Sequence, residues 1–457
     1  MILAIDQGTT GTTCLVVDEQ LHVHGRGYAE LPQHFPRPGW VEHDPDEIWA
    51  SVLVAAAAAG SEVDTVAITN QRETTILWDR ATGRPVAPAI VWQDRRTSER
   101  CAGLDAELIR TRTGLVPDPY FSATKLEWLL QRHGGDGLAF GTVDSWLVWR
   151  LTGGEQHVID VTNASRTLLV SLETLDWDDE LLALFGVDRA LLPRIVPSEG
   201  EVAEGELLGR TVRIKGIAGD QQAALYGQGC HAPGEGKATY GTGSFVLVHT
   251  GADCSPPPDG LLRTAAADGY ALEGAVLSSG AAVQWLRDGL GLVADAAESE
   301  ALAASVPDSG GVAFVPALTG LGSPWWDADA RGLITGLTRG TTRAHLVRAT
   351  LEAIAHQVAD VTDALPERPA VLRADGGATA NGFLMQFQAD LLGVPVEVAA
   401  ERETTALGAA ALAAGGGARV AVGAVYEPSR SRDEVETLRA AWREAVNRSR
   451  TSREVLS

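Results

Sequence analysis

Short hydrophobic runs alternate with longer segments that repeat apolar residues at helical spacing along most of the chain. The short runs predict β-strands at Ile2–Ile5, Thr12–Val17, Val63–Ile68, Thr75–Trp78, Gly236–Tyr240, Phe245–His249 and Val371–Ala374. The longer segments predict helices at Asp46–Ala59, Ala123–Arg132, Ala281–Gly289, Arg343–Ala364 and Gly382–Leu392. Strands and helices mixed in this way indicate the α/β fold class.

Two breaks in this pattern suggest how the chain is organised. The stretch GQGCHAPGEG (Gly227–Gly236) ends a helical segment and leads into a new strand, and ADCSPPPDG (Ala252–Gly260) has the composition of a surface loop. A chain of 457 residues is long for one core and natural for two domains. We therefore expect one domain over residues 1–227 and a second over residues 228–457, which ends in an amphipathic helix and a polar tail.

Composition narrows the classes of function. The chain is 45% hydrophobic and 21% charged, an ordinary globular balance, and its formal net charge is −23 at pH 7. Such an acidic chain is a poor partner for nucleic acid or an anionic membrane, so we expect neither. An anionic small molecule remains compatible, because backbone N–H groups, arginine and a metal ion can make a site locally positive.

Cysteine spacing and hydropathy bear on the compartment. The 4 cysteines are scattered without C-x-x-C spacing, which argues against a structural zinc site or a disulfide framework and fits a reducing environment. The N-terminus has no basic region followed by a long apolar stretch, and no run approaches the roughly 18 apolar residues of a membrane-spanning helix. We therefore expect a cytoplasmic protein without integral membrane contact.

The segment DQGTTGTT (Asp6–Thr13) joins two of the predicted strands. A plain hairpin turn is one interpretation, since glycine and threonine are common there. The other is a phosphate-binding loop, in which Gly8 and Gly11 allow close approach of the backbone, and N–H groups and threonine hydroxyls donate hydrogen bonds. The lysine of a Walker A loop is absent. Asp6, at the end of the strand, is a candidate to hold Mg²⁺ through water.

Two further glycine-rich turns have the same pair of interpretations. TYGTGSF (Thr239–Phe245) repeats the strand–turn–strand order, which suggests two domains that each present one turn to a shared cleft. DGGATANGF (Asp375–Phe383) lies between a predicted strand and a helix, where a helix N-terminus offers N–H groups to an anion or a nucleotide. A plain turn with Asn381 as helix cap is the alternative.

The segment GIAGDQQAALYGQ (Gly216–Gln228) places Asp220 at the start of a predicted helix. Aspartate is a leading N-cap residue, so capping alone is one interpretation. The other makes Asp220 a base, because a helix N-terminus favours its ionised form, which can accept the proton of an alcohol during phosphoryl transfer.

Adjacent opposite charges, Arg72 and Glu73, lie in TNQRETTILW. An exposed ion pair is the ordinary interpretation. A site for neighbouring hydroxyl groups needs donors and acceptors side by side, and this pair supplies both. Trp92 and Phe245 are candidates to cover the carbon edge of a polyol, although each aromatic residue alone is typical of a core.

At these residues the chain resembles the FGGY family of carbohydrate kinases, and in particular its glycerol-phosphorylating members. The similar segments follow in order from Ile2 to about Leu412 at compatible spacing. They are DQGTTGTT, GWVEHDPDEIW, TNQRETTILWD, AIVWQDRRT, TGLVPDPYFSATK, GTVDSWLVWRLTGG, TNASRTLL, GIAGDQQAAL, TYGTGSF, ALEGAV, PALTGLGSPWWDADARG and DGGATANGFLMQFQADLLG. The resemblance implies two actin-like (ribonuclease-H-like) domains with an interdomain catalytic cleft.

The resemblance also implies a role for each matching residue. Asp220 would be the catalytic base. The substrate would contact Arg72, Glu73, Tyr120, Asp220 and Gln221, with Trp92 and Phe245 against its carbon atoms. The nucleotide would contact Thr9, Thr10, Gly11, Thr13 and Thr242 through its phosphates and Gly280, Gln284, Gly377 and Asn381 nearer the nucleoside. Asp6 would lie near the metal.

Departures from the family pattern matter for affinity and regulation. Relatives place serines and an arginine where this chain has Gly11, Thr12 and Thr13, so one positive charge near the phosphates is missing. GELLGRTVRIKG lacks the glycine-rich loop that binds fructose 1,6-bisphosphate in some members, so we expect no such inhibition. His231 lies in a different context from the activating phosphohistidine of other members.

The implied activity is ATP-dependent phosphorylation of glycerol to sn-glycerol 3-phosphate, with Mg²⁺ as cofactor and glycerol and ATP/ADP as partners. The resemblance further implies a homodimer or homotetramer. Activity on another small polyol or ketose, such as dihydroxyacetone or erythritol, stays open. A catalytically silent sensor or scaffold is a third interpretation; it would need a damaged base or phosphate turn, and Asp6, Asp220 and Thr242 are all present.

Overall fold

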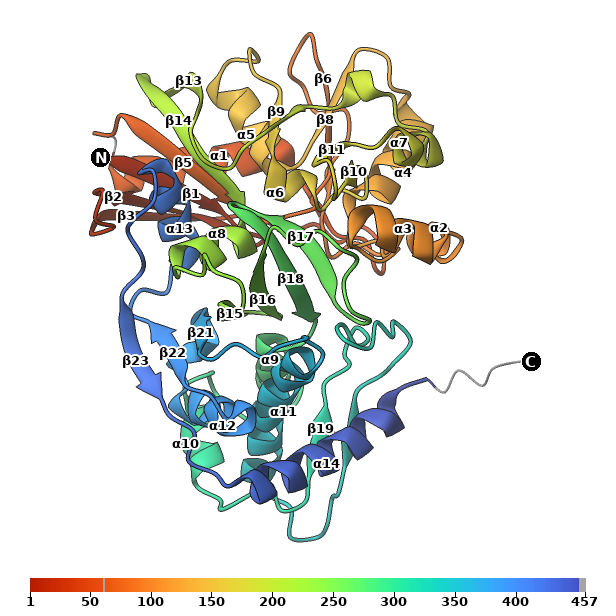
Figure 1. The fold of residues 1–457 in the computed structure, drawn as a ribbon, viewed down its shortest axis with the longest axis vertical. Helices are drawn as coiled ribbons and strands as arrows, with labels where there is room; N and C mark the ends of the chain where they lie inside the picture. Colours follow the sequence, from red (N-terminus) through yellow and green to blue (C-terminus); the bar gives the residue numbers. More distant parts are fainter. Residues whose placement is uncertain (61, 452–457) are drawn as a thin grey trace.

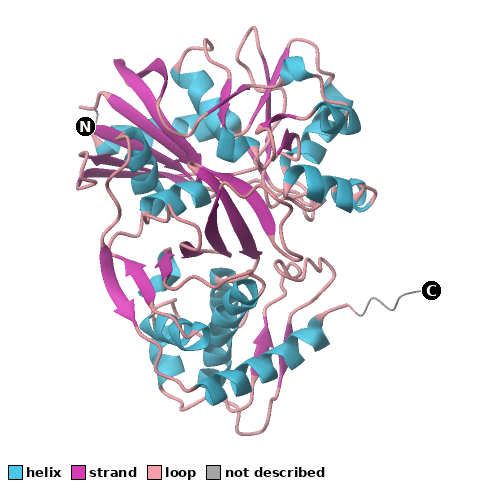
Figure 2. Cartoon of the chain, viewed as in Figure 1, coloured by secondary structure: helices cyan, strands magenta, loops and turns pink. Residues whose placement is uncertain are grey.

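The computed structural model describes residues 1–60 and 62–451. Two main β-sheets with helices on their faces make up most of this part of the chain (Figure 2). In sheet order, the N-terminal sheet contains β13 (Glu201–Leu207), β14 (Arg210–Gly219), β5 (Thr65–Asn70), β1 (Ile2–Gln7), β2 (Gly11–Val17) and β3 (Val23–Glu30). The C-terminal sheet contains β17 (Leu262–Ala266), β18 (Gly269–Val276), β16 (Ser244–Gly251), β15 (Gly236–Tyr240), β21 (Leu372–Asp375), β22 (Val396–Ala399) and β23 (Val422–Tyr426).

The two sheets share one pairing pattern. In the first, β1 pairs antiparallel with β2, and β2 with β3, while β1 and β5 are parallel and so are β5 and β14. In the second, β15 pairs antiparallel with β16, and β16 with β18, while β15 and β21 are parallel and so are β21 and β22. This repeat is the pair of actin-like domains that the sequence led us to expect, one above the other in Figure 1.

The strands and helices predicted from periodicity are present, with ends that shift by at most two residues. The predicted helices correspond to α1 (Pro45–Ala59), α4 (Ser122–His133), α9 (Gly280–Asp288), α11 (Arg343–Asp363) and α12 (Gly382–Leu392). The C-terminal amphipathic helix is α14 (Arg432–Ser449), and the predicted polar tail beyond residue 451 lies outside the described residues. Residues 252–260 form a loop, as expected.

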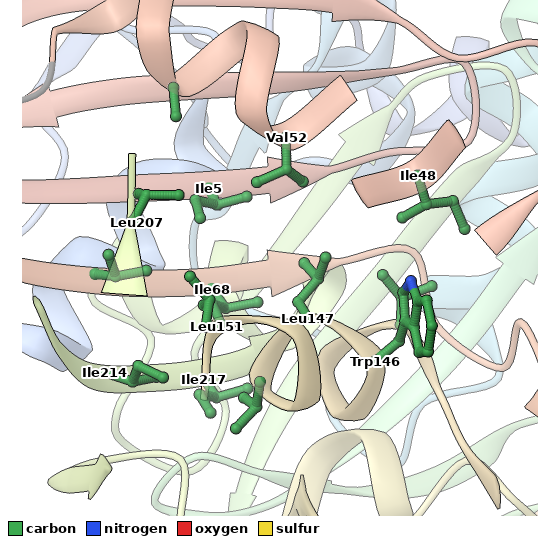
Figure 3. Close-up of a cluster of buried hydrophobic side chains, with 14 of the residues drawn as sticks. Ile5, Ile48, Val52, Ile68, Trp146, Leu147, Leu151, Leu207, Ile214 and Ile217 are labelled. Carbon is green, nitrogen blue, oxygen red and sulfur yellow. The ribbon is translucent and has the colours of Figure 1, made fainter. Parts of the chain in front are cut away.

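Helices α1 and α5 (Val143–Leu151) cover one face of the N-terminal sheet (Figure 3). Ile48 and Val52 of α1 pack against Ile5 of β1 and Ile68 of β5, and all of these side chains are fully buried. Alternate residues of a strand face opposite sides, so the neighbours of Ile5 and Ile68 point to the other face. Complete burial of each such aliphatic side chain contributes about 1.5–3 kcal/mol.

The opposite face of that sheet is covered by α8 (Asp220–Gly227), which follows β14, and α13 (Thr404–Ala413), which follows β22. The two helices approach so closely that a Cβ on Gly408 would lie 1.8 Å from the Ala223 carbonyl oxygen. Glycine permits this backbone contact. Thus α13, although late in the sequence, packs against β1 and β5 of the N-terminal sheet (Figure 1).

Helix α11 packs on the C-terminal sheet through Leu351, Ile354 and Val358. Helix α14 docks on α11, with the Trp442 ring stacked on His356 at a centroid distance of 5.1 Å. Among residues 1–60 and 62–451, no helix combines the length and apolar composition needed to cross a membrane.

Shorter elements connect these layers. The remaining strands are β4 (Glu42–His43), β6 (Ile76–Asp79), β7 (Ala89–Ile90), β8 (Leu138–Gly141), β9 (Val158–Asp160), β10 (Val170–Ser171), β11 (Asp176–Trp177), β12 (Arg194–Val196), β19 (Ala313–Val315) and β20 (Leu333–Thr335). The remaining helices are α2 (Ser98–Ala102), α3 (Ala106–Thr113), α6 (Val161–Ala164), α7 (Asp179–Phe185), α10 (Glu298–Ala304) and the 3₁₀ turns η1 (Arg189–Leu191) and η2 (Gly377–Ala380).

Candidate active site

Arg72 and Glu73 follow the carboxyl end of β5, which brings them to the boundary between the two sheets. The Arg72 guanidinium forms a two-pronged pair with Glu273 of β18, with Nη1–Oε2 at 2.6 Å and Nη2–Oε1 at 3.0 Å. Its Nη2 also donates to the Tyr120 hydroxyl at 3.1 Å, and its Nε lies 3.3 Å from Asp220 Oδ1. The side chain of Arg72 is only 2% exposed, so its orientation is fixed on every side.

Glu73 has a backbone φ of 62°, in the left-handed region that non-glycine residues seldom adopt. Such conformations persist where the surrounding structure enforces them, often at functional sites. Arg166, directly after α6, donates from Nε to Glu73 Oε1 at 2.7 Å. Burial raises the pKa of the Glu73 carboxyl, and the charges of Arg72 and Arg166 oppose that rise.

Asp220 is the first residue of α8, and the N-cap position belongs to Gly219. Its Oδ1 accepts a hydrogen bond from the Gln221 backbone N–H at 2.8 Å. The Asp220 side chain is 29% exposed, whereas those of Glu73 and Glu273 are at most 1% exposed. Within this cluster, Asp220 is therefore the most exposed carboxylate.

Three aromatic rings lie beside the charged cluster. The Trp92 ring centroid is 5.6 Å from that of Tyr120 and 6.4 Å from that of Phe245, both in edge-to-face geometry. The Arg72 guanidinium carbon lies 5.8 Å from the Phe245 centroid. The Trp92 indole Nε1 donates to Thr9 Oγ1 at 3.0 Å, so the aromatic group is tied to the first glycine–threonine turn.

The first turn connects β1 and β2, as its hairpin interpretation requires. The Gly8 N–H donates to the Gly11 carbonyl at 2.9 Å, and the Thr10 carbonyl accepts from Leu31 N–H. A Cβ on Gly11 would lie 2.5 Å from the Tyr28 hydroxyl and 2.7 Å from the Ala29 carbonyl oxygen, so no larger residue fits there unless β3 moves. Thr13 is paired with Asp6 across the two strands, and directly opposed residues share one face of a sheet.

Asp6 is buried where β1 ends. Burial is the main cause that raises its pKa to about 7, and the nearby carboxylates of Asp220 and Glu403 add to the rise. Thr405, at the start of α13, donates a hydrogen bond to Asp6 Oδ2, and this hydrogen bond partly opposes the rise in the pKa. A divalent cation would relieve the repulsion among these carboxylates.

The donor set suits magnesium. No cluster of three or more His, Cys, Asp or Glu side chains arranged for a metal ion occurs in residues 1–60 and 62–451. Mg²⁺ does not need one, because it usually keeps several waters and takes one or two carboxylates together with substrate phosphates. Asp6, at the end of β1 and next to the first glycine–threonine turn, can take part in such a site.

A cavity of about 580 Å³ opens beside the second turn, in the C-terminal half of the chain. The predicted residues that line it are Thr242, Gly280, Gln284, Gly377 and Asn381. The residues predicted from the first turn, Thr9, Thr10, Gly11 and Thr13, belong to the N-terminal sheet and its β1–β2 turn and do not line the cavity. The start of α13 links the two sheets: the Thr405 hydroxyl donates a hydrogen bond to Asp6 of β1, and the Thr404 hydroxyl donates one to Asp375 of β21.

Local sequence explains the shape of this cavity. The Gly280 N–H donates to the Gly241 carbonyl at 2.9 Å, and a Cβ on Gly280 would lie 2.6 Å from the same oxygen. Asn381 caps α12 by accepting from Leu384 N–H at 3.0 Å, and its Nδ2 donates to Ser299 Oγ at 3.2 Å. The capping interpretation of Asn381 therefore holds alongside its place on the cavity lining.

Charged residues at the site that carried no assignment from the sequence include Arg166, Lys237 and Glu273, and on the cavity lining Arg287, Glu300 and Arg402. Lys237 is fully buried and its Nζ donates to Gln221 Oε1 and to Thr239 Oγ1, so the Gln221 side chain is directed to this lysine. Burial lowers the pKa of Lys237, while the charges of Asp375 and Asp220 oppose that change. A glutamate inside the apolar run YALEGAV was the available signal for Glu273.

These features indicate a two-domain phosphotransferase. Each actin-like domain presents a glycine–threonine turn, charged side chains pair where the two sheets meet, and a cavity opens beside the second turn. One fold can carry several different reactions, so the fold and the site indicate the class of enzyme but not its substrate.

Comparisons with known proteins identify the family. Sequence profiles of the FGGY family of carbohydrate kinases match residues 1–227 with the N-terminal domain and residues 236–416 with the C-terminal domain. A glycerol kinase of Acidovorax sp. (strain JS42) is 51% identical over 97% of this chain and 98% of its own length, and glycerol kinase 2 of Thermotoga maritima is 50% identical over 98% of each chain. The crystal structure of Plasmodium falciparum glycerol kinase with ADP matches with a TM-score of 0.88 at 35% identity over 98% of each chain. This chain belongs to the FGGY family of carbohydrate kinases.

Proposed function

We propose that this protein transfers the γ-phosphoryl group of ATP to the 3-hydroxyl of glycerol, giving sn-glycerol 3-phosphate and ADP. The observation that carries the proposal is Asp220, a reachable carboxylate beside the buried Arg72 and Tyr120 and close to the Asp6 carboxylate. Relatives named glycerol kinase, about half identical over nearly the whole chain, support the choice of substrate.

The polyol is bound by donors and acceptors in alternation. Arg72 and the Tyr120 hydroxyl donate to glycerol oxygens, while Glu73 and Asp220 accept from its hydroxyl groups. Gln221 lies next to the base, and Trp92 and Phe245 pack against the carbon atoms of the substrate. A site built from buried hydrogen-bonding groups discriminates strongly against analogues that leave those groups unpaired.

Asp220 acts as the general base. As the bond between glycerol O3 and the γ-phosphorus forms and the bond from that phosphorus to the β–γ bridging oxygen breaks, the O3 proton passes to the Asp220 carboxylate. The carboxylate is the form of this side chain that can accept the proton. General-base catalysis of this kind contributes about 10²–10⁴-fold, and positioning of the reactants contributes much of the rest.

The nucleotide occupies the cavity of about 580 Å³. Gly280, Gln284, Gly377 and Asn381 contact the nucleoside side. Thr242 from the second turn and Thr9, Thr10, Gly11 and Thr13 from the first contact the phosphates through hydroxyl and N–H groups. Asp6 would hold Mg²⁺ through water, and the bound cation would supply charge neutralisation at the phosphoryl group.

Three further expectations belong to this proposal. The N-terminal domain covers residues 1–227 and the C-terminal domain residues 228–457, and the protein acts as a homodimer or homotetramer in the cytoplasm. The division at residue 227 has support from α8, which ends there, and from β15, which begins the second sheet at residue 236.

A coupled ADP-release assay with a panel of acceptors tests the proposal. We expect kcat/KM to be highest for glycerol and lower for dihydroxyacetone, erythritol and xylulose. A preference for another acceptor would assign the protein to a different substrate of the same reaction. ADP release that does not depend on any acceptor would contradict phosphoryl transfer to a polyol.

A further inference from the structure

Four buried side chains of alternating charge form a closed network at the polyol pocket, the group of proposed substrate-binding residues that includes Arg72, Glu73, Tyr120 and Asp220. Glu273 accepts from Arg72 with both oxygens and from Arg166 Nη2 with Oε1 at 3.0 Å. Arg166 in turn donates from Nε to Glu73 Oε1 at 2.7 Å. The side chains of all four residues are between 0% and 2% exposed. Arg72 and Glu73 contact substrate in the proposed function, whereas Arg166 and Glu273 have no role in it.

We propose that Glu273 and Arg166 are positioning residues of the polyol pocket: Glu273 fixes the Arg72 guanidinium, and Arg166 fixes the Glu73 carboxylate. This inference rests on the proposed function, because it assigns what holds the two substrate-binding groups. It also makes the polyol pocket a joint product of the two halves of the chain, since Glu273 comes from β18 of the C-terminal sheet.

The hydrogen bonds of Arg72 show what Glu273 does. A carboxylate that meets a guanidinium with two parallel bonds fixes the plane of the guanidinium as well as its position. That plane directs Nη2 toward the Tyr120 hydroxyl and Nε toward Asp220 Oδ1, at 3.1 and 3.3 Å. Without Glu273, the guanidinium would lose the partner that sets both directions.

Arg166 does the same for Glu73. It occupies Oε1 of that carboxylate, and Oε2 has no hydrogen-bond partner within the described part of the chain, so one oxygen stays available for a substrate hydroxyl. Arg166 lies with its guanidinium carbon 5.4 and 5.1 Å from the ring centroids of Tyr120 and Phe121, so packing on aromatic faces holds it as well. The left-handed backbone of Glu73 is thereby held in place from its side chain.

Charge balance decides the protonation state of the network. Burial alone would raise the pKa of Glu273, but Arg166 and Arg72 outweigh it and lower the pKa to about 2. Glu273 is therefore ionised at neutral pH. Replacing it by glutamine would remove one negative charge and turn an amide N–H₂ toward two guanidinium groups.

Contacts between the two halves hold Glu273 against the N-terminal residues. The Arg263 N–H of β17 donates to the Gly114 carbonyl at 2.8 Å. The hydroxyl groups of Thr264 and Ser165 are hydrogen-bonded at 2.9 Å, and the Tyr270 hydroxyl donates to the Leu172 carbonyl at 2.8 Å. Strands β17 and β18 are thus fixed to the N-terminal half by these three hydrogen bonds besides those of Glu273.

Steady-state kinetics of Glu273→Gln provide the test. Removing one partner of a buried ion pair leaves the other charge uncompensated, so we expect the KM for glycerol to rise at least about tenfold. The KM for ATP should stay within about twofold, because the nucleotide cavity is lined by other residues. Arg166→Lys keeps the positive charge but lacks the planar fork, and should raise the KM for glycerol by a smaller factor. It serves as the second variant if Glu273→Gln does not fold.

Asp360→Asn is the matched control. Asp360 of α11 is buried and paired with Arg439 of α14 at 2.7 Å, and neither residue belongs to the polyol pocket. If Glu273 had a purely structural role, Glu273→Gln and Asp360→Asn would both lose stability, and the KM for glycerol would be unchanged in both. An unchanged KM for glycerol in Glu273→Gln or Arg166→Lys, with an active wild-type enzyme, would overturn this inference alone. A wild-type protein that does not phosphorylate glycerol would overturn the proposed function and this inference with it.

Discussion

The contact between α8 and α13 makes Gly408→Ala an informative perturbation. A Cβ at this position would lie 1.8 Å from the carbonyl oxygen and 2.5 Å from the carbonyl carbon of Ala223. An ordinary carbon–oxygen contact is about 3.3–3.6 Å, so the helices must separate by roughly 1.5 Å. The obstacle is backbone, which no rotamer change relieves.

Two opposing effects set the magnitude. Alanine in place of glycine within a helix stabilises it by about 1 kcal/mol. Overpacking of a close contact destabilises by about 1–3 kcal/mol, and we take the upper value because backbone atoms collide. The expected net loss is about 2 kcal/mol of unfolding free energy. Since α13 begins with Thr404 and Thr405, which bond Asp375 and Asp6, the shift should also weaken binding of Mg·ADP.

Urea denaturation followed by circular dichroism, with and without Mg·ADP, measures both effects. Gly103→Ala is the control, because its Cβ would meet the Arg100 carbonyl oxygen at 3.7 Å, an ordinary contact. We expect Gly103→Ala to unfold at the wild-type urea midpoint and Gly408→Ala at a lower one. A Gly408→Ala variant as stable as the wild type would refute the close packing of these two helices.

Three further predictions concern Asp6 and Asn381. The pKa of Asp6 is raised to about 7, so the carboxylate takes up a proton as pH falls below that value. The apparent Mg²⁺ affinity should therefore fall by up to about tenfold per pH unit below pH 7. Kinetic titration with Mg²⁺ at several pH values measures this, and a pH-independent affinity would contradict it. The raised pKa also means that folding favours the neutral form of Asp6, so the stability that this form contributes is lost as pH rises through 7. In the absence of metal, Asp6→Asn should therefore melt at a higher temperature than the wild type above pH 7. Asn381→Ala removes the cap of α12 and the hydrogen bond to Ser299 on the cavity lining. We expect it to lose about 1 kcal/mol of stability, and calorimetry should show a several-fold lower affinity for ADP. An unchanged ADP affinity would exclude Asn381 from the nucleotide site.

Periodicity predicted the elements that carry clear signals. Ile2–Ile5 is an uninterrupted apolar run and became a central strand. Gly236–Tyr240 also became a central strand, although Gly236 and Lys237 interrupt its apolar and β-branched pattern. Strand β13 has the sequence EVAEGEL, which lies at the sheet edge with most residues partly or fully exposed, and no apolar run marks it. Helix α13 is alanine-rich and apolar all round, so its pattern does not say which sheet it covers.

The candidate site was predictable where motif and chemistry coincide. Arg72, Glu73 and Asp220 lie in short polar segments between apolar runs, and the structure brings all three together. Arg166 and Glu273 act through contacts between segments 107 residues apart in sequence. No local pattern reports such a distant partner, and a buried charge shows only as an isolated glutamate in an apolar strand.

Turnover of Asp220→Asn with glycerol and ATP tests the central claim most directly. The amide keeps the shape of the side chain but cannot accept the proton of the 3-hydroxyl. We expect kcat to fall by about 10²–10⁴-fold while calorimetry still detects binding of glycerol. Near-wild-type turnover of Asp220→Asn would contradict the assignment of Asp220 as the base for phosphorylation of glycerol.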